Sequence, residues 1–150
     1  MEKENLKEVL AQLIEAFSGL EKPSPLTTYD GSYCNEGVDY FNATDWDTAT
    51  YYDYVEGMEG AIICSPRTKA YLIPKLFQIV LLRRFGVASD GAENNLSTEL
   101  EFWPIDEEVE RLLNFSQKKA IVAAWAHLDT YRYYHSGSHV ARLLAEHWNI

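Results

Sequence analysis

The strongest constraint on the fold is the spacing of apolar residues, which recur every three or four positions in several parts of the chain. In the first of these parts the apolar positions, separated by charged residues, are Leu6, Val9, Leu10, Leu13, Ile14, Phe17 and Leu20. This spacing places an apolar stripe along one face of an α-helix. Gly19, followed by Pro23 and Pro25, is expected to end that helix.

A second helix is predicted to begin at Ser65. A serine at the N-cap followed by proline satisfies a free backbone N–H group and presets the backbone angle, and the chain has Ser65 and Pro66 in this order. Pro74 lies further along the same apolar pattern and cannot donate a backbone hydrogen bond, so we expect the helix to kink or restart there. Gly86 is expected to end it.

The stretch between these two helices is less regular. One or two short helices are expected from Asn35 onward, with a capping box formed by Thr44 and Asp47. The runs TYYDYV, residues 50–55, and GAIIC, residues 60–64, are rich in aromatic or aliphatic residues. Their patterns are too short to decide between helix, strand and loop.

The C-terminal half of the chain is also predicted to be mostly helical. Residues 96–103 are expected to form a helix or turn, and residues 106–113 a short acidic helix. Ser116 is expected to cap a long helix. Gly137 is then expected to break this helix before a last one over residues 138–148.

Together these patterns predict an all-α chain, with a single domain over residues 1–150 and a bundle-like fold of five or six helices with at most one or two short strands. The composition, 47% hydrophobic and 24% charged, is that of a soluble globular protein. No apolar run reaches the roughly 18 residues of a membrane helix, and charges interrupt the first twenty residues, which argues against a secretory signal. Cys34 and Cys64 form no CxxC pair and are expected to be reduced thiols of a cytoplasmic protein.

The charge of the chain is strongly acidic and unevenly distributed. A formal net charge of −10 argues against binding to nucleic acid, which is contacted through Lys and Arg. No Lys or Arg lies between Lys22 and Arg67, whereas this part of the chain contains eight acidic residues, Asp30, Glu36, Asp39, Asp45, Asp47, Asp53, Glu56 and Glu59. Residues 38–57 alone combine five of these acids with six aromatic rings.

A calcium loop is one interpretation of these acids. Counted from Asp45, four acidic positions of an EF-hand loop are matched, by Asp45, Asp47, Asp53 and Glu56. Positions five and six of the loop, which need an oxygen ligand and a glycine, are Ala49 and Thr50. The mismatch argues against calcium. Paired carboxylates such as Asp45 and Asp47 would do acid–base chemistry only if burial shifted the pKa of one of them.

Other catalytic and metal-binding patterns are equally incomplete. His135 and His139 have the four-residue spacing of a helical metal pair, but Gly137 between them breaks the helix on which that spacing would matter. The chain contains no GxSxG motif, and its glycines form no phosphate-binding loop. We therefore expect no catalytic residue, no metal and no cofactor.

A protein-binding surface is the interpretation that fits the acidic and aromatic residues best. Tyrosine supplies contact area at low entropic cost, and carboxylates attract a basic partner. The residues expected to bind the partner are Asp39, Asp45, Asp47, Tyr51, Tyr52, Asp53, Tyr54 and Glu56. The expected partner is a basic protein such as a toxin that acts on nucleic acid, which would make the chain an immunity or antitoxin-type protein.

Three alternatives stay open at this point. The acidic surface could serve only to keep the protein soluble. The chain could instead be a small enzyme or metal-dependent protein with a pocket beside the helix that contains Pro74. It could also be a structural subunit of a larger assembly, which needs only an exposed apolar patch.

Four stretches of the chain resemble an uncharacterised bacterial domain family. They are CNEGVDYFNATDW, SPRTKAYLIPKLF, FSQKKAIVAAWAHL and HVARLLAEHW, and they extend over residues 34–148. The most distinctive of their features is the run Tyr71-Leu72-Ile73-Pro74, in which an aromatic residue and a leucine precede a proline within a helix. The resemblance implies a small, mostly helical cytoplasmic protein, and it assigns no catalytic residue.

Overall fold

The structure, a computed structural model, describes residues 3–27, 35–87, 92–128 and 136–150. These residues form eight α-helices and one 3-10 helix, and none of them is in a strand, so the all-α prediction is confirmed. The elements are α1 (Lys3–Ala16), α2 (Asn35–Ala43), α3 (Tyr51–Ile63), α4 (Pro66–Leu81), α5 (Ala92–Phe102), η1 (Trp103–Ile105), α6 (Glu107–Glu110), α7 (Phe115–Ala126) and α8 (Gly137–Trp148).

The described residues form more helices than the expected five or six because stretches whose structure the sequence left open are helical. The two runs left open between helix, strand and loop, residues 50–55 and 60–64, belong almost entirely to the single helix α3. The stretch at 96–103 lies mostly in α5, and a separate one-turn helix, α6, follows η1. Aromatic residues raise strand propensity, but here burial of the rings against neighbouring helices outweighs it.

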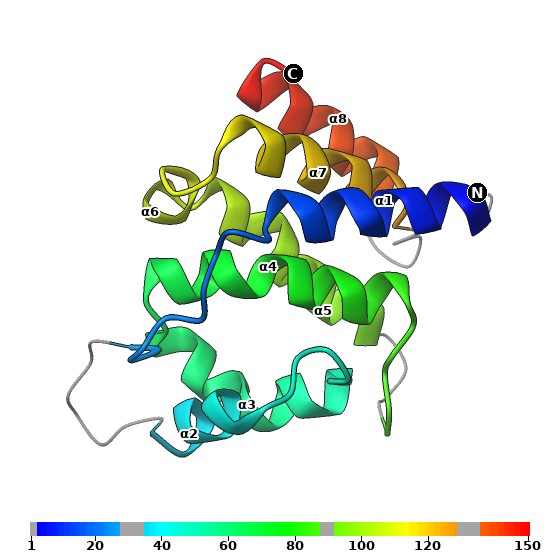
Figure 1. The fold of residues 1–150 in the computed structure, drawn as a ribbon. Coiled ribbons are helices and arrows are strands. Elements are labelled where there is room, and N and C mark those ends of the chain that lie inside the picture. Colours follow the sequence, from blue (N-terminus) through cyan, green and yellow to red (C-terminus); the bar gives the residue numbers. More distant parts are fainter. Residues whose placement is uncertain (1–2, 28–34, 88–91, 129–135) are drawn as a thin grey trace.

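The helix α4 lies at the centre of the molecule. Figure 1 shows α2 and α3 on one side of it and α1, α7 and α8 on the other, and α4 contacts α1, α3, α5, α6, η1 and α7. Its buried residues are Thr68, Ala70, Leu72, Ile73, Pro74, Leu76, Phe77, Ile79, Val80 and Leu81. A helix that is buried on nearly all sides in this way organises the packing of its neighbours.

The beginning of α4 is capped as predicted. The Ser65 hydroxyl accepts a hydrogen bond from the Thr68 backbone N–H at 3.2 Å, and Pro66 occupies the first turn. The Thr68 hydroxyl donates to the Leu26 carbonyl at 2.8 Å, and the Ser65 N–H donates to the same carbonyl at 3.0 Å. These bonds attach the chain that follows α1 to the first turn of α4.

Pro74 was expected to make the helix kink or restart, and Gly86 was expected to end it. The helix α4 continues through Pro74 without restarting, and Pro74 itself is buried. The helix ends at Leu81, well before Gly86, and two residues after it have left-handed backbone angles, with φ of 56° at Arg83 and 64° at Gly86. The left-handed turn at Arg83 therefore ends the helix.

The caps of α7 and α8 also differ from those predicted. Asn114, and not Ser116, caps α7: its side chain accepts from the Gln117 N–H at 2.8 Å, and the Gln117 side chain accepts from the Asn114 N–H at 2.9 Å. Ser136 caps α8, which begins at Gly137. A Cβ atom on Gly137 would lie 1.8 Å from the Leu128 carbonyl oxygen, so a close approach of two backbone segments requires glycine there.

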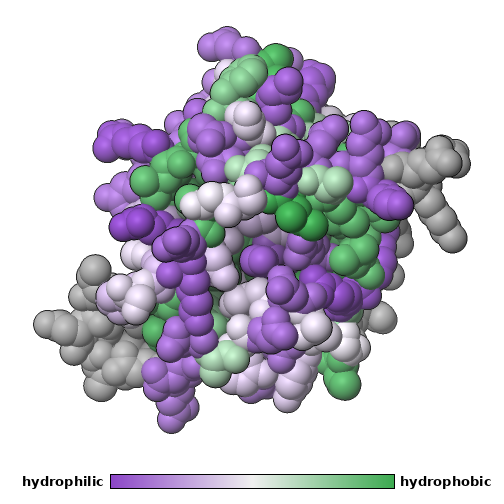
Figure 2. All heavy atoms as spheres, viewed as in Figure 1, coloured by the Kyte–Doolittle hydropathy of each residue, from purple (hydrophilic) through white to green (hydrophobic). Residues whose placement is uncertain are grey.

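The described helices are each too short or too polar to cross a membrane. Figure 2 shows hydrophilic side chains over much of one face, with apolar residues in small separate groups. The buried apolar residues form one hydrophobic cluster that extends from α1 to α8.

A glycine-to-alanine substitution tests the contact between α2 and α3. Alanine favours a helix interior over glycine by about 1 kcal/mol, but a Cβ on Gly57 of α3 would lie 2.0 Å from Cδ1 of Phe41, which is fully buried. We therefore expect Gly57→Ala to lower the free energy of unfolding by about 1–2 kcal/mol in urea denaturation.

Gly19→Ala is the matched control, since no atom lies within 4 Å of the added Cβ. Its free energy of unfolding should stay within about 0.5 kcal/mol of the parent value. Equal stability of the two variants would contradict the close packing of α2 on α3.

Candidate functional site

The candidate site is the acidic segment, which we define as residues 36–57. It comprises α2, the loop that follows it and the first half of α3, and α2 and α3 pack against each other on one side of α4 (Figure 1). The eight expected partner-binding residues lie in three different environments: in the core, at the beginning of α3 and at the surface.

Four aromatic rings of the acidic segment are in the core. Phe41 contacts Trp46 and Tyr54 at ring-centroid distances of 5.3 and 6.0 Å, and Tyr51 contacts Tyr54 at 6.1 Å. Tyr51 also packs edge-to-face on Phe85, which follows α4. Only 7% of Tyr51 and 3% of Tyr54 is exposed. The two tyrosines therefore hold α3 against the body of the protein and are not available as contact surface.

Burial has an electrostatic effect on one of these rings. Desolvation, with a smaller contribution from the charge of Glu99, raises the pKa of Tyr54 far above its ordinary value. The phenol is therefore neutral at every physiological pH. Tyr54 therefore acts as a large apolar side chain. The sequence did not indicate this, because the acidic residues beside Tyr54 favoured a solvent-exposed position.

Asp53 has a structural role at the beginning of α3. Its Oδ2 accepts hydrogen bonds from the Thr50 backbone N–H at 2.8 Å and from the Thr50 hydroxyl at 3.1 Å, while the Asp53 N–H donates to that hydroxyl at 3.4 Å. These reciprocal bonds form a capping box. The expected capping box of Thr44 and Asp47 is wrong, because the Thr44 hydroxyl donates instead to the Tyr40 carbonyl at 2.8 Å.

Asp53 also joins α3 to α2. The Tyr40 hydroxyl of α2 donates to Oδ1 of Asp53 at 2.9 Å. The backbone N–H of Thr50, supported by the hydroxyls of Tyr40 and Thr50, holds the pKa of the Asp53 carboxyl below its usual value. The hydrogen bond that the Tyr40 hydroxyl donates to Asp53 also raises the pKa of Tyr40, and the charges of Asp53 and Glu56 add to this effect. These side chains therefore share one electrostatic environment.

Asp47 is exposed but partly neutralised from another helix. Its Oδ1 lies 3.3 Å from the Lys75 ammonium of α4, and its backbone carbonyl accepts a hydrogen bond from the Arg84 guanidinium. Lys22 similarly donates to the Asn42 carbonyl at the end of α2. An exposed pair such as Lys75–Asp47 stabilises a protein by about 0–1 kcal/mol. The basic residues missing from the segment itself are thus supplied by its surroundings.

The remaining members of the expected set lie at the surface. Asp39, Asp45 and Glu56 are exposed. Tyr52 is 45% exposed, and a hydrogen bond with Glu56 raises its pKa. A pocket of about 360 Å³ opens between α2 and the loop, lined by Tyr40, Ala43, Thr44, Asp45, Thr48 and Asp53. This wall offers carboxylate and hydroxyl oxygens, which suit a cationic hydrogen-bond donor such as a lysine or arginine side chain.

The metal hypotheses depend on residues that the structure separates or does not describe. Among the described residues, no group of three or more His, Cys, Asp or Glu side chains could hold a metal ion. In the EF-hand alignment Asp45 lies in the loop, whereas Asp53 and Glu56 lie on α3. His135 of the histidine pair, together with Tyr29, Asp30, Tyr33 and Cys34, lies outside the described residues.

The described cysteine is a core residue. Cys64 is 6% exposed, at the junction of α3 and α4. Burial raises the pKa of its thiol to about 11. A thiol that stays protonated at neutral pH is a poor nucleophile, so Cys64 contributes to packing.

Removal of the Asp53 carboxylate tests the structural role assigned to it. We expect Asp53→Ala to lower the free energy of unfolding by about 1–2 kcal/mol at pH 7, since both the cap and the bond to Tyr40 are lost. The folded-state pKa of Asp53 lies below its unfolded value. The carboxylate therefore stabilises the fold above about pH 4, and this contribution is lost as pH falls through the folded-state pKa.

Urea denaturation between pH 7 and pH 2.5 provides the measurement. The stability difference between the parent chain and Asp53→Ala should shrink toward acid pH. Asp39→Ala, at an exposed position of α2, is the control and should change stability by less than about 0.5 kcal/mol. A pH-independent difference for Asp53→Ala would show that its ionised form has no special partner.

Comparisons of the chain with protein-family models, with curated proteins and with solved structures found no match. The resemblance to an uncharacterised bacterial domain family therefore stays a prediction. The chemistry of the acidic segment is the basis on which a function is proposed for this chain.

Proposed function

We propose that the acidic segment binds a basic protein, and that the chain is an immunity or antitoxin-type protein that neutralises a basic toxin by occluding it. The observation that carries this proposal is a group of phenol and carboxylate side chains that interact with one another, with the exposed Tyr52 ring at one end and Asp45 beside Tyr40 and Asp53 in the wall of the neighbouring pocket. We call this group the acidic face and define it as Tyr40, Asp45, Tyr52, Asp53 and Glu56. Its members come from α2, the following loop and α3.

Preorganisation of the acidic face supports a binding role. Asp53 is held by Thr50 and Tyr40, and Tyr52 is hydrogen-bonded to Glu56, so these side chains lose little freedom when a partner arrives. Tyr52 presents an exposed aromatic ring beside the carboxylates. An aromatic ring surrounded by acceptors suits an arginine or lysine side chain, which can stack on the ring and donate to the carboxylates.

The charge of the whole chain supports the class of partner. A formal net charge of −10 accelerates association with a basic protein and disfavours acidic partners. Toxins that act on nucleic acid need a basic cleft to attract phosphate, so an acidic protein that covers such a cleft would neutralise them. In this proposal the pocket lined by Asp45 and Asp53 receives one basic side chain of the toxin.

Charge reversal on the acidic face tests the proposal. The partner to be used is a purified basic toxin domain encoded beside the gene, and the association rate is measured by biolayer interferometry at low and at high salt. The test variant carries Asp45→Lys and Glu56→Lys, which change exposed carboxylates and leave the Asp53 cap intact. We expect the association rate at low salt to fall by about tenfold or more, and its salt dependence to weaken.

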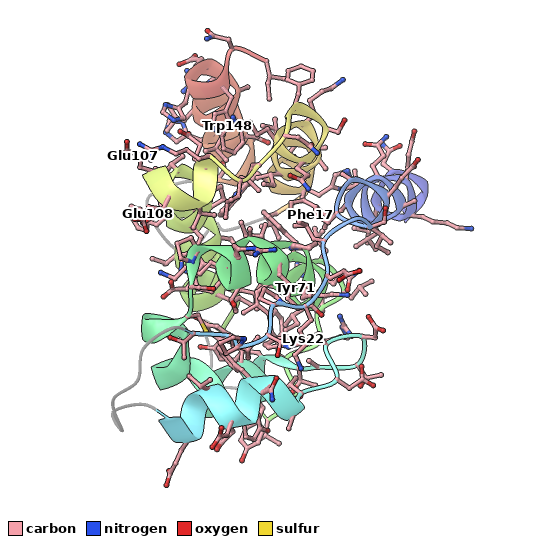
Figure 3. The ribbon with its side chains drawn as sticks, turned by 60° about the vertical axis from the view of Figure 1, so that its left-hand side comes forward. Phe17, Lys22, Tyr71, Glu107, Glu108 and Trp148 are labelled. Atoms are coloured by element: carbon pink, nitrogen blue, oxygen red, sulfur yellow. The ribbon has the colours of Figure 1, made fainter. Side chains whose placement is uncertain are left out.

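A control variant with the same change in net charge separates a local effect from a global one. Glu15→Lys and Glu108→Lys alter exposed acids of α1 and α6. Figure 3 shows Glu108 on α6, on the other side of α4 from α2 and α3. This variant should bind more tightly than the test variant. Equal association rates for the two variants, or no binding of the toxin by the parent chain, would overturn the proposal.

A further inference from the structure

Exposed apolar side chains gather at one end of the bundle. Of the eleven large apolar residues that are exposed in the described part of the chain, four lie within fourteen consecutive positions, and each is between 40% and 60% exposed: Phe102, Ile105, Leu112 and Phe115. They belong to the end of α5, to η1, to the turn after α6 and to the beginning of α7. We call residues 102–119 the α6 corner.

These side chains face outward because their neighbours fill the core. Trp103 and Leu113 are buried. Phe102 precedes η1 and Ile105 ends it, and residues three positions apart in a 3-10 helix lie on the same side. The Asp106 N–H donates to the Phe102 carbonyl at 3.0 Å and holds this turn closed. Phe102 and Ile105 therefore present one apolar surface to solvent.

The charge of the chain changes sign within the α6 corner. Four acids, Asp106, Glu107, Glu108 and Glu110, occupy residues 106–110, and three bases, Arg111, Lys118 and Lys119, occupy residues 111–119, which contain no acid. Figure 3 shows Glu107 and Glu108 on the outer side of α6. The corner thus has an acidic half and a basic half.

Trp148 of α8 joins the two halves. Its Nε1 donates to Oε1 of Glu110 at 2.7 Å, and the Lys118 ammonium lies over its ring, 5.7 Å from the centroid. The Lys119 ammonium lies 5.6 Å from the centroid of the exposed Phe115 ring. The acidic and basic halves are therefore neighbours in space, with apolar side chains among them.

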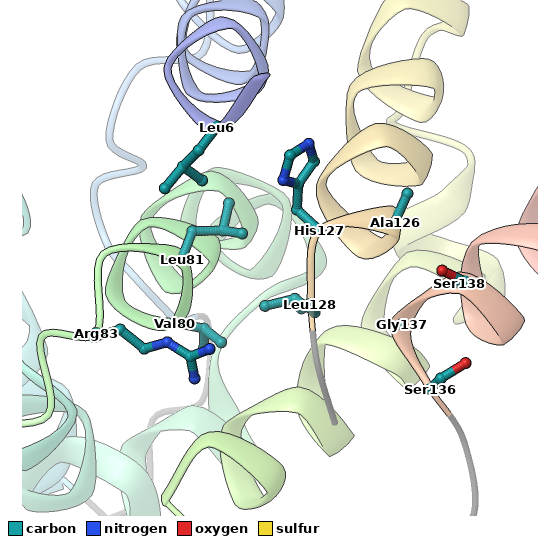
Figure 4. A pocket seen from close by; sticks show the side chains of 10 residues that line it. All are labelled: Leu6, Val80, Leu81, Arg83, Ala126, His127, Leu128, Ser136, Gly137 and Ser138. Atoms are coloured by element: carbon teal, nitrogen blue, oxygen red, sulfur yellow. The ribbon is translucent and has the colours of Figure 1, made fainter. Parts of the chain in front are cut away.

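The α6 corner is described throughout and lies away from the acidic face. Figure 1 shows α6 on the other side of α4 from α2 and α3. A cavity of about 490 Å³, whose wall includes Ala126 and His127, lies at the opposite end of α7 (Figure 4). A partner bound at the α6 corner would leave both the acidic face and this cavity uncovered.

We infer that the α6 corner is a contact surface for a second copy of this chain, related to the first by a two-fold axis. In such a dimer each contact occurs twice, with the roles of the two copies exchanged. The acidic half of each copy then faces the basic half of the other, and the four exposed apolar side chains of both copies exclude water between them. A uniformly basic or uniformly acidic partner would meet like charges in one of the two halves, so neither fits the corner as well.

The contact area is small. Four side chains per copy, each about half exposed, belong to the class of interfaces below about 1,200 Å² that is typical of transient association. The net charge of −10 on each copy adds a long-range repulsion. We therefore expect a reversible dimer with a Kd in the range of about 10–100 µM.

Sedimentation velocity of the full chain at rising concentration tests the inference. We expect the parent chain to pass from monomer to dimer between about 5 and 500 µM. Phe102→Gln should raise the Kd about tenfold, because it removes a large ring from the apolar centre. Ile14→Gln, at a similarly exposed residue of α1, is the matched control and should leave the Kd unchanged. A parent chain that stays monomeric throughout, or equal effects of the two variants, contradicts the inference.

An exchange of charges tests the pairing across the two-fold axis. Glu108→Lys alone and Lys119→Glu alone each place like charges opposite one another, so each should raise the Kd about fivefold or more. An equimolar mixture of the two variants restores opposite charges at both contacts and should dimerise about as well as the parent chain. Glu15→Lys, which makes the same change in net charge as Glu108→Lys on an exposed residue of α1, is the control and should not weaken association.

Circular dichroism spectra and thermal unfolding establish that each variant is folded. If the folded variants associate no more strongly when mixed than either does alone, the acidic and basic halves do not face each other and the inference is wrong. Toxin binding is measured separately, at the acidic face, so failure of the dimer and failure of the proposed function give different results.

Discussion

Burial of α4 on nearly all sides is the constraint on which the rest of the structure depends. Its ten buried residues, Pro74 among them, must be covered by other helices, because apolar surface left in water costs about 25 cal/mol per Å². Helices α1, α3, α5 and α7 each lie against it. The end of α4 also places the acidic segment, since the Arg84 carbonyl accepts a hydrogen bond from the Tyr51 N–H at 2.8 Å. Val80, Leu81 and Arg83, at or just after the same end, line a cavity of about 490 Å³.

Much of this fold can be read from the sequence, and the exceptions have physical reasons. The apolar spacing of α1 and the Ser65–Pro66 cap of α4 are local signals, and the structure contains both. The capping box was misplaced because Thr44–Asp47 and Thr50–Asp53 have the same spacing of hydroxyl and acid. Only tertiary contacts distinguish them, since the Tyr51 N–H after Thr50 is bound by the end of α4.

The acidic segment could be predicted less completely than the helices. Composition reveals the excess of carboxylates, but it does not show that Lys75 of α4 and Arg84, which follows α4, approach the loop. Nor does it separate Tyr51 and Tyr54, which are buried, from Tyr52, which is exposed. The cavity of about 490 Å³ beside the end of α4 has no local sequence signal, because the described residues that line it come from α1, α4, α7, α8 and the chain next to these helices.

The capping role of Asp53 divides the acids of this segment into two kinds. Asp39, Asp45 and Glu56 present their charge to solvent, while the Asp45 side chain also accepts a hydrogen bond from the Asp47 N–H at 3.1 Å and Glu56 is hydrogen-bonded to Tyr52. Asp53 must reach Thr50 and Tyr40 at once, so side-chain length matters there as much as charge. We therefore expect aspartate to be retained at position 53 during evolutionary divergence, while the neighbouring exposed acids can be substituted. A change of partner could then alter the surface residues without disturbing α3.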